Sequence, residues 1–397
     1  MEEVALLLLL VQLPATAILL SRLLQAPGRQ PPLQTRSPTP DLLGRVSVIV
    51  PTLNEAARIS PCLEGLSRQG YEVREIIIVD SRSQDGTVDR VKAMQTHDPR
   101  FRVLTDDPLP SGWVGRPWAL HTGFLHSSPD SEWILGIDAD TQPQPGLVAS
   151  LIQTAQQGGY DLISLAPQFI LKELGEFWLQ PALLITLIYR FGAAGSAADG
   201  ADRVMANGQC FLCRRSLLTQ LDGYTSARRS FCDDVTLARN AARSGAKVGF
   251  LDGANLLKVR MYEGMKETWQ EWGRSLDLKD ACSTPQKWGD LGFLIAVQGL
   301  PLLVTLGIAV YLILGGAATL PIRLALGLNG FLVLIRFALQ WAIASSYDFT
   351  QARSAWTFWL ALFADPLAVY RIFLSSLRTP TQWRGRQYQP LSASPSE

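Results

Sequence analysis

The sequence has few charged residues for its length. Only 18% of its 397 residues are charged, whereas an average soluble protein has about 25%. The mean hydropathy is positive, at +0.12. These values exclude a disordered or fibrous protein and argue against a purely soluble one. The length predicts one large catalytic domain with additional structure around it.

The chain also lacks an excess of charge of either sign. It has 36 basic and 35 acidic residues, which leave a net charge of +1. Binding of nucleic acid requires a basic face or stripe, so we expect no nucleic-acid partner. The five cysteines are odd in number and occur in a chain too long to need disulfides for stability. This pattern excludes a disulfide framework and favours a reducing compartment.

Histidine is scarce, and no metal motif built on cysteine is present. The three histidines, His97, His121 and His126, are scattered, and we assign none of them a role. Cys210 and Cys213 have the spacing of half a zinc site. No second cysteine pair or suitably spaced histidine accompanies them, so the alternation of a strand explains their spacing better.

Near the start of the sequence, Val4–Leu20 is an apolar run without a charged residue, in which only Gln12 and Thr16 are polar. It is long enough for a tilted membrane span. Acidic residues precede it and basic residues follow it, which places the downstream side in the cytoplasm. A cleaved signal peptide would have a basic start and a small-residue cleavage site, so residues 1–25 are predicted to be an anchor. Residues 26–44, which are rich in proline, are predicted to be an extended linker.

A second hydrophobic region covers residues 291–377. Leu291–Tyr347 contains 57 residues, of which only Arg323 and Arg336 are charged, and it divides near Gly315 into two predicted helices. Ala355–Leu377 is a third candidate, which spans the membrane, re-enters it or lies at its interface. Counting spans places the tail, residues 378–397, outside the cell, whereas its arginines place it inside. The shorter run at residues 177–188 suits an interfacial or buried helix.

The middle of the chain, residues 45–281, has a different pattern. Short apolar runs alternate there with helical stretches, which predicts an α/β domain with a mainly parallel sheet covered on both faces. The predicted strands are Val46–Val50, Glu75–Val79, Phe101–Leu104 and Trp133–Ile137. The predicted helices are Glu55–Gln69, Gly86–Thr96 and Val114–His126. Ligands of such sheets bind beyond the carboxyl ends of the strands.

Polar residues follow the predicted strands at those ends. The first strand runs into Pro51–Glu55 and the second ends at Asp80, which is followed by Asp85-Gly86-Thr87. Each of these acids has a structural alternative, because Asp also ends strands, forms turns and caps helices. Asp138-Ala139-Asp140 then follows the fourth strand. In extended backbone these two carboxylates share a face, where their hard oxygens suit Mg²⁺ or Mn²⁺ carrying a diphosphate.

Two later segments complete the set of candidates. Asp233 and Asp234 precede a helical stretch, and either one caps that helix or serves in catalysis. Transfer of a sugar to a hydroxyl requires a carboxylate that takes the proton, and Asp234 is our candidate for this base, supported by Asp233. Trp272 and Arg274 lie in a segment whose aromatic residues suit a sugar, a lipid or the membrane interface.

In this order, these segments resemble the family 2 glycosyltransferases over about residues 45–280. The resemblance implies a nucleotide-diphospho-sugar transferase fold of the GT-A type, a nucleotide-sugar donor, a divalent cation and inversion at the anomeric carbon. It implies that Asp80 accepts a hydrogen bond from the nucleotide base, that Asp138 and Asp140 hold diphosphate and metal, and that Asp234 is the general base. The implied donor-binding residues are Pro51, Asn54, Glu55, Asp80, Asp138, Gln270 and Arg274.

The chain departs from the family pattern in two places. Asp233 stands where the family has Glu, and the late Gln-x-x-Arg-Trp box is not intact, because Trp272 precedes Arg274. The segments 105–108, 112–119 and 205–210 are similar to the membrane-bound branch that glycosylates lipids, including hopanoid and ceramide glycosyltransferases. The segments 233–240 and 271–280 resemble most the carotenoid (myxol) 2'-O-glycosyltransferases of cyanobacteria.

The resulting hypothesis is a membrane-bound inverting glycosyltransferase, with its catalytic domain on the cytoplasmic side, that acts on a lipophilic acceptor. We expect Asn207, Gly208 and Gln209 to line the acceptor site together with Trp272; the alternative for 207–209 is a buried strand and turn. The rival functions are a polysaccharide synthase and a non-catalytic membrane scaffold or transporter. Ionisable pairs inside hydrophobic segments would mark a transport path, whereas the acids gather in the middle of the sequence.

Overall fold

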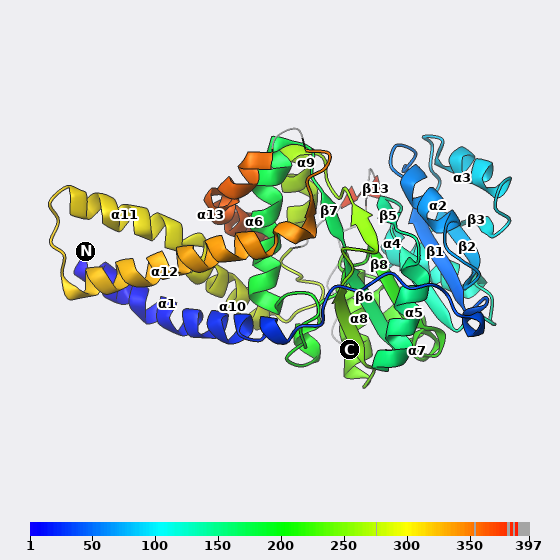
Figure 1. Cartoon of the computed structure of the whole chain (residues 1–397), viewed down its shortest axis with the longest axis horizontal. Helices are drawn as coiled ribbons and strands as arrows, with labels where there is room; N and C mark the ends of the chain where they lie inside the picture. Colours follow the sequence, from blue (N-terminus) through cyan, green and yellow to red (C-terminus); the bar gives the residue numbers. More distant parts are fainter. Residues whose placement is uncertain (275, 353–354, 379–381, 384–385, 388–397) are drawn as a thin grey trace. The chain divides into compact units, whose positions relative to one another are not determined.

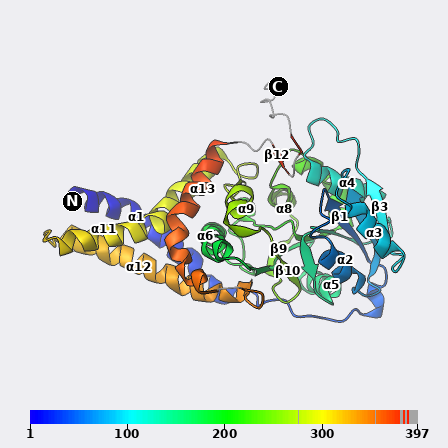
Figure 2. The ribbon, with the colours of Figure 1, turned by 90° about the horizontal axis from the view of Figure 1, so that it is seen from above.

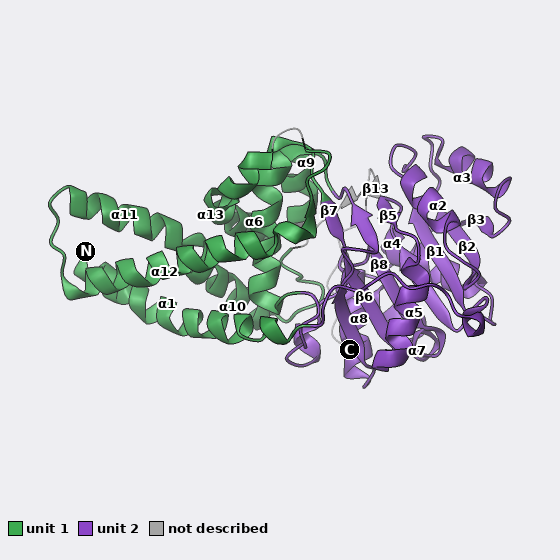
Figure 3. Ribbon diagram, viewed as in Figure 1, with its two compact units in different colours: residues 1–29, 170–193, 262–378 green, residues 30–169, 194–261, 379–397 purple. Residues whose placement is uncertain are grey.

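The computed structural model describes residues 1–274, 276–352, 355–378, 382–383 and 386–387. These residues form two compact units (Figures 1 and 3). Unit 1 contains the described residues within 1–29, 170–193 and 262–378, and unit 2 contains residues 30–169, 194–261, 382–383 and 386–387. The chain therefore passes back and forth between the units.

Unit 2 is built on a seven-stranded sheet with the order β3-β2-β1-β4-β8-β6-β9. Its strands are β1 (Val46–Thr52), β2 (Val73–Asp80), β3 (Phe101–Thr105), β4 (Trp133–Ile137), β6 (Leu162–Ala166), β8 (Cys210–Arg214) and β9 (Val248–Asp252). The pairings of β1 with β2 and β4, of β2 with β3, and of β6 with β9 are parallel. Strand β8 runs antiparallel to both of its neighbours. A second sheet includes β7 (Gln168–Ile170), β10 (Leu257–Val259) and β5 (Thr141–Pro143).

Helices cover both faces of the seven-stranded sheet. Because side chains alternate along a strand, Val48 and Val50 of β1 join one apolar core while Ile49 joins the other. The first core packs against α2 (Ser60–Ser67), α3 (Thr87–Gln95) and α5 (Leu147–Gly158). The second packs against α4 (Gly115–His126), α7 (Arg215–Gln220) and α8 (Asp233–Arg243). Figure 2 shows α2 and α5 on one side of β1 and α4 on the other.

The predicted strands are all present, and the mainly parallel sheet is confirmed. One predicted helix, Glu55–Gln69, starts later than expected, because α2 begins at Ser60. The preceding residues instead form a loop held by polar side chains. The backbone N–H groups of Glu55 and Ala56 donate to Thr87 Oγ1 and Asp85 Oδ2, at 2.9 Å each. Cys210 and Cys213 are buried in β8, as strand alternation predicts.

Unit 1 is helical. Its helices are α1 (Glu2–Leu23), α6 (Leu174–Phe191), α9 (Gly264–Glu271), α10 (Thr284–Leu294), the π-helix η6 (Ile295–Gly299), α11 (Pro301–Ile313), α12 (Leu320–Ala342), the 3₁₀ helix η8 (Ala355–Ala364) and α13 (Asp365–Leu377). Three described segments are long and apolar enough to cross a membrane: 2–28, 320–342 and 355–377. A fourth span is possible if α10–η6 and α11, which are bent by 43°, form one broken span.

Helix α12 has its polar face inward and its apolar face outward, the reverse of a surface helix in a soluble protein. Its inward face carries the polar side chains of Asn329, Arg336 and Gln340, all buried. Its outward face carries large apolar side chains such as Leu334 and Trp341, which are 68% and 64% exposed. Water does not tolerate such an apolar surface, whereas lipid does. The polar face finds partners inside the unit: Gln12 Nε2 of α1 donates to Asn329 Oδ1 at 2.8 Å, and Asn329 Nδ2 donates back to Gln12 Oε1 at 2.8 Å.

One ionisable pair, which the sequence did not predict, lies within the hydrophobic segments. Arg336 of α12 donates through Nε to Asp365 Oδ2 at 2.7 Å, and both side chains are buried. Sequence patterning missed this pair because its members lie in separate helices and meet only after folding. The prediction for the side of the tail rests on Arg378, Arg384 and Arg386, of which Arg384 lies outside the described part of the chain, and it stays a prediction.

Close packing of α4 on β1 gives a first prediction. A Cβ atom at Gly123 of α4 would collide with the Ile49 side chain of β1, which is fully buried. We expect Gly123→Ala to lower the free energy of unfolding by about 1–3 kcal/mol through overpacking. Gly289→Ala is the control, since this helical glycine has open space around its Cβ position and alanine favours helix by up to about 1 kcal/mol. Thermal unfolding of the two purified variants measures the difference, and equal melting temperatures would contradict the packing argument.

Candidate active site

The first part of the site lies at the carboxyl ends of β1 and β2. These strands are parallel, and their register places Thr52 beside Asp80. Asp80 Oδ1 accepts hydrogen bonds from Thr52 Oγ1 at 3.1 Å and from Ser83 Oγ at 2.6 Å. Its Oδ2 accepts from Ser83 N at 2.9 Å. Asp80 is thus held in one orientation, and its Oδ2 retains a lone pair for a ligand, because a carboxylate oxygen accepts two hydrogen bonds.

The loops after β1 and β2 are bonded to one another. Asn54, which has a positive φ of 56°, donates through N to Ser83 Oγ at 2.8 Å and accepts at Oδ1 from Gln84 N at 2.9 Å. Asn tolerates this left-handed conformation better than most residues. Asp85, which also accepts from Thr87 Oγ1 at 2.6 Å, therefore has a structural role in this contact. Of the predicted donor-binding residues, Pro51 ends up within β1, and Asn54 and Glu55 follow it in this loop.

The Asp138–Asp140 segment differs from its predicted conformation. Strand β4 ends at Ile137, and the Asp138 carbonyl accepts from Thr141 N at 3.3 Å and from Thr141 Oγ1 at 2.7 Å. Residues 138–141 therefore form a turn, and the premise that Asp138 and Asp140 share a face of extended backbone is wrong. The Asp138 N–H donates to the Gln209 carbonyl at 3.2 Å, which ties this turn to the start of β8.

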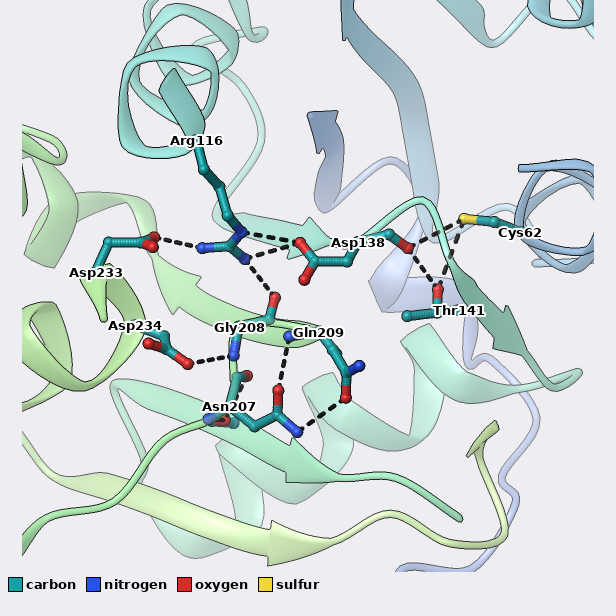
Figure 4. Close-up of polar contacts among 10 residues, drawn as sticks. Cys62, Arg116, Asp138, Thr141, Asn207, Gly208, Gln209, Asp233 and Asp234 are labelled. Atoms are coloured by element: carbon teal, nitrogen blue, oxygen red, sulfur yellow. Dashed lines mark hydrogen bonds and ion pairs between the residues drawn. The ribbon is translucent and has the colours of Figure 1, made fainter. Parts of the chain in front are cut away.

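Arg116 connects the separate acidic segments of unit 2 (Figure 4). Its Nε and Nη2 donate to Asp138 Oδ1 at 3.0 and 2.9 Å, and its Nη1 donates to Asp233 Oδ2. Nη2 also donates to the Gly208 carbonyl at 2.7 Å. The guanidinium is almost buried, with 12% of the side chain exposed. One cation thus joins Asp138, which is predicted to bind the diphosphate, to Asp233, which is predicted to support the general base. These hydrogen bonds are strong because both partners are charged.

Arg116 had no predicted role, although its position in the sequence carries a weak signal. Arg116 lies in the first turn of α4, where the helix dipole disfavours a positive charge. Acidic partners would offset this unfavourable effect. The partners lie far away in sequence, at Asp138 and Asp233, so the sequence alone indicates the need for them but not their identity.

Asp233 and Asp234 begin helix α8, where the helix dipole favours their negative charge. Asp234 Oδ2 accepts a hydrogen bond from Gly208 N at 2.6 Å. Asp233 is turned to Arg116. The two adjacent acids therefore have different partners, one a fixed cation and the other a backbone N–H.

Burial raises the pKa of both acids. For Asp233 burial outweighs the opposing effect of Arg116, and together with the nearby charge of Asp234 it raises the pKa from 3.8 to about 7. The pKa of Asp234 is raised as well, again by burial, against Arg116 and its backbone hydrogen bonds. A carboxylate with a raised pKa is a stronger base, which is the property that proton abstraction near neutral pH requires.

The predicted acceptor residues Asn207, Gly208 and Gln209 form the segment that enters β8. Asn207 N donates to Ser164 Oγ at 2.6 Å, and Asn207 Oδ1 accepts from Gln209 N at 3.0 Å. Figure 4 shows the segment beside Asp234. Its backbone contacts both Arg116 and Asp234, so it positions the charged groups whether or not it touches an acceptor.

Three predicted residues belong to unit 1. Trp272 is buried there and packs against Tyr262, with ring centroids 6.2 Å apart. The Gln270 carbonyl accepts from Arg371 Nη2 at 3.2 Å. The side chain of Arg274 lies outside the described part of the structure. For these residues the predicted roles stay predictions.

The residues available for a metal ion fit a cation that is shared with substrate. The described residues include no group of three or more His, Cys, Asp or Glu side chains arranged to hold a metal. Mg²⁺ commonly binds through one or two carboxylates plus substrate phosphates and water. Asp138 and Asp140 supply two such carboxylates beside the loop that ends β4. Their chemistry therefore fits Mg²⁺ or Mn²⁺ whose remaining ligands come from a diphosphate and water.

Comparison with known proteins identifies the fold that carries these residues. The family described as "Glycosyl transferase family 2" matches residues 47–222, which include Asp80, Arg116, Asp138 and Asp140. This chain carries a family 2 glycosyltransferase domain. The predictions of the family and of a glycosyltransferase enzyme are confirmed.

Relatives of this glycosyltransferase include enzymes named for a carotenoid acid. A 4,4'-diaponeurosporenoate glycosyltransferase of Staphylococcus aureus is 23% identical over 354 residues, which cover 86% of this chain and 88% of that one. The enzyme of the same name from Staphylococcus haemolyticus is 23% identical over 241 residues. That alignment covers 60% of this chain and spans 63% of the length of the relative.

A solved structure confirms the fold. The mannosyltransferase PcManGT from Pyrobaculum calidifontis, in complex with GDP-Man and Mn²⁺, aligns with a TM-score of 0.52 and 19% identity. The alignment covers 92% of this chain and 98% of that one. The α/β fold of the GT-A type that the glycosyltransferase was predicted to have is therefore present.

The raised pKa of Asp233 gives a second prediction. Its folded-state pKa of about 7 lies above the ordinary value of 3.8, so the folded protein binds this proton more tightly than the unfolded chain does. The contribution of Asp233 to stability is therefore most favourable below pH 4 and is lost as the pH rises to 7. The unfolding free energy of the wild type should therefore fall as the pH rises from 4 to 7. We expect that of Asp233→Asn to fall by on the order of 2 kcal/mol less over the same range. Denaturant unfolding at several pH values measures this, and parallel curves for the wild type and the variant would contradict the assignment.

Proposed function

We propose that this glycosyltransferase moves a sugar from a nucleotide-diphosphate sugar to a hydroxyl group of a lipophilic acceptor, with inversion at the anomeric carbon. One observation carries the proposal. Arg116 bonds both to Asp138, in the segment proposed for the donor diphosphate, and to Asp233, in the pair proposed for the base. One side chain thus contacts both a residue proposed for donor binding and a residue of the pair proposed for proton abstraction.

The donor would lie along the carboxyl ends of the strands. Asp80 retains hydrogen-bonding capacity at Oδ2 and would accept from the nucleotide base, with Pro51, Asn54 and Glu55 in the adjoining segment. Asp138 and Asp140 would hold the diphosphate through Mg²⁺ or Mn²⁺, and PcManGT, of the same fold, has Mn²⁺ in its complex. Such a cation stabilises charge on the leaving diphosphate. We retain Gln270 and Arg274 as proposed donor contacts.

Asp234 would act as the general base. Its carboxylate would take the proton of the acceptor hydroxyl while the oxygen attacks the anomeric carbon, and the nucleoside diphosphate would leave from the opposite side. Gly208 N, which donates to Asp234 Oδ2 at 2.6 Å, fixes that oxygen. The carboxylate so held would take the proton of the hydroxyl. Arg116, held by Asp138 and Asp233, would lower the electrostatic cost of collecting negative charge in one place.

We propose a carotenoid as the acceptor, glycosylated at a hydroxyl in the manner of myxol 2'-O-glycosylation. Two findings support this class: the Staphylococcus relatives are named for 4,4'-diaponeurosporenoate, and three helices of unit 1 are apolar enough to cross a membrane. Asn207, Gly208, Gln209 and Trp272 are the proposed acceptor contacts. We place the catalytic domain, residues 45–281, on the cytoplasmic side, where nucleotide sugars are made, with residues 1–25 as anchor and 291–377 as membrane helices.

Replacement of the base gives the test of the reaction. We expect Asp234→Asn to lower sugar transfer at least about 100-fold, because Asn cannot take a proton, while binding of the nucleotide sugar is retained. Product mass after incubation with GDP-mannose or UDP-glucose, Mn²⁺ and a hydroxylated carotenoid measures transfer. Asp130→Asn is the matched control, since that side chain is 73% exposed. Transfer at the wild-type rate would contradict both the base and the hydroxyl acceptor, because a carboxylate acceptor is already ionised and needs no base.

The acceptor class has a separate test. Pigments and lipids extracted from cells that lack this chain are compared by mass with those of the parent strain. We expect loss of a hexose or deoxyhexose from a carotenoid. An unchanged carotenoid profile with an altered hopanoid or ceramide-like lipid would contradict the carotenoid acceptor and keep the reaction.

A further inference from the structure

The last apolar segment of unit 1, residues 355–377, has the length and composition of a membrane span. It consists of η8 and α13, and Figure 2 shows α13 crossing the direction of α11 and α12. A span places its two ends on opposite sides of the bilayer. The other apolar helices of unit 1 define two ends of a bundle, against which both ends of this segment can be located.

Helices α1, α11 and α12 lie side by side with a fixed register. Near the start of α1, Ala5 lies in one apolar cluster with Ile308 of α11 and Ile322 of α12. Near the end of α1, Arg22 lies over the Phe293 ring of α10, 4.7 Å from its centroid. Thus α1 and α12 run in the same direction, and α10 with α11 runs back. We call the end of the bundle at which α1 and α12 end and α10 begins the inner end of unit 1.

The first half of residues 355–377 lies near the inner end. Gln340, close to the last residue of α12, donates through Nε2 to the Phe358 carbonyl at 2.9 Å. Arg336 Nε donates to Asp365 Oδ2 at 2.7 Å. Because a helix rises 1.5 Å per residue, Arg336 lies about 9 Å from the end of α12. The middle of the segment, which contains Asp365, is therefore close to that depth.

The last turn of α13 lies at the same end. Lys287 Nζ, near the start of α10, donates to the Ser376 carbonyl at 3.4 Å. Ser375 Oγ donates at 2.6 Å to Oδ1 of Asp277, which precedes α10. Along a helix, Phe358 and Ser375 are about 26 Å apart, which approaches the thickness of about 30 Å of a bilayer core. Both nonetheless lie at the inner end, so the segment lies across the ends of the other helices.

One face of residues 355–377 is a stripe of large apolar side chains that recur at helical spacing and are 37–61% exposed. The stripe consists of Trp356, Leu360, Phe363, Leu367, Tyr370 and Leu377. On the opposite face, Ala361, Ala364 and Ala368 are fully buried. Trp359, beside the stripe, has its ring 4.7 Å from that of Trp341, which belongs to the exposed apolar face of α12. The stripe is therefore continuous with a surface that suits lipid.

We propose that residues 355–377 form an interfacial helix, which lies with its apolar stripe on the lipid surface at the inner end of unit 1 and does not cross the bilayer. Such helices bury an apolar face about 5–10 Å deep, at the boundary between headgroups and acyl chains. Trp356 and Tyr370 of the stripe are of the residue types that favour this boundary. Lipid is thus the partner that the stripe fits.

An interfacial segment changes the number of membrane crossings. The chain would cross three times, through α1, the bent pair of α10–η6 and α11, and α12. The tail would then lie on the same side as the linker that follows α1, so counting spans would agree with the arginines of the tail. Only the name of that side, the cytoplasm, rests on the proposed function.

Labelling of single cysteines in the full chain tests the number of crossings. Gln351→Cys and Arg378→Cys place exposed thiols on either side of the segment. All variants carry Cys282→Ala, because the other native cysteines are buried. Ser37→Cys in the linker and Ala318→Cys between α11 and α12 mark the two sides of the membrane. We expect a membrane-impermeant maleimide to label Ala318→Cys in intact cells and the other three thiols only after lysis.

The outcomes separate the interfacial helix from the proposed side of the catalytic domain. Labelling of Gln351→Cys and Arg378→Cys on opposite sides would show a fourth span and overturn the proposal. Labelling of both in intact cells together with Ser37→Cys, while Ala318→Cys is protected, would keep the interfacial helix and contradict the cytoplasmic placement.

Depth distinguishes an interfacial helix from a segment that enters the bilayer and returns. A nitroxide on Leu367→Cys, in nanodiscs of phosphatidylcholine and phosphatidylglycerol, reports depth through its collisions with oxygen and with a water-soluble nickel chelate. We expect about 5–10 Å. Phe331→Cys is the matched control, since Phe331 is 45% exposed at the middle of α12, and it should report about 15 Å. Equal depths would show a re-entrant segment, and protection of Leu367→Cys from both reagents would show a second copy on the stripe. Either result would overturn the proposal.

Discussion

The active-site architecture of unit 2 depends on one buried cation. Arg116 bonds directly to Asp138 and Asp233 and acts electrostatically on Asp234. Three acids confined to a buried region repel one another and lose the solvation of water, and both effects favour protonation or unfolding. Arg116 reduces this cost for all three. The residual cost is visible in Asp233 and Asp234, whose pKa values stay raised in spite of the arginine.

The sheet brings these groups together because of its strand directions. Parallel β1, β2 and β4 end at the same edge, which gathers Thr52, Asp80 and Asp138. The antiparallel strand β8 begins where β4 ends, since Ile137 pairs with Cys210. The Asn207–Gln209 segment is thereby brought to the same edge from the opposite direction. A wholly parallel sheet would place the start of that strand at the far edge, away from Asp138.

The sequence predicted those features that depend on local pattern. Runs of apolar residues located the strands, and the polar residues that follow them located Asp80 and Asp138. Conformation at a strand end was less predictable: the Asp138–Asp140 turn depends on hydrogen bonds from Thr141, which alternation of polarity does not encode. The ion pairs of Arg116 and Arg336 were beyond prediction for another reason. Each partner is 22 or more residues away, and only the fold determines which acid meets which base.

The two buried arginines, Arg116 and Arg336, are surrounded by different amounts of negative charge. Arg336 faces one carboxylate, that of Asp365, so the two charges balance. Arg116 faces three, Asp138, Asp233 and Asp234, so the protein groups alone carry an excess of negative charge. Protonation of Asp233, whose pKa is raised to about 7, relieves part of this excess and leaves Asp234 ionised. The divalent cation proposed for the donor complex would relieve the rest of the excess while leaving Asp234 ionised.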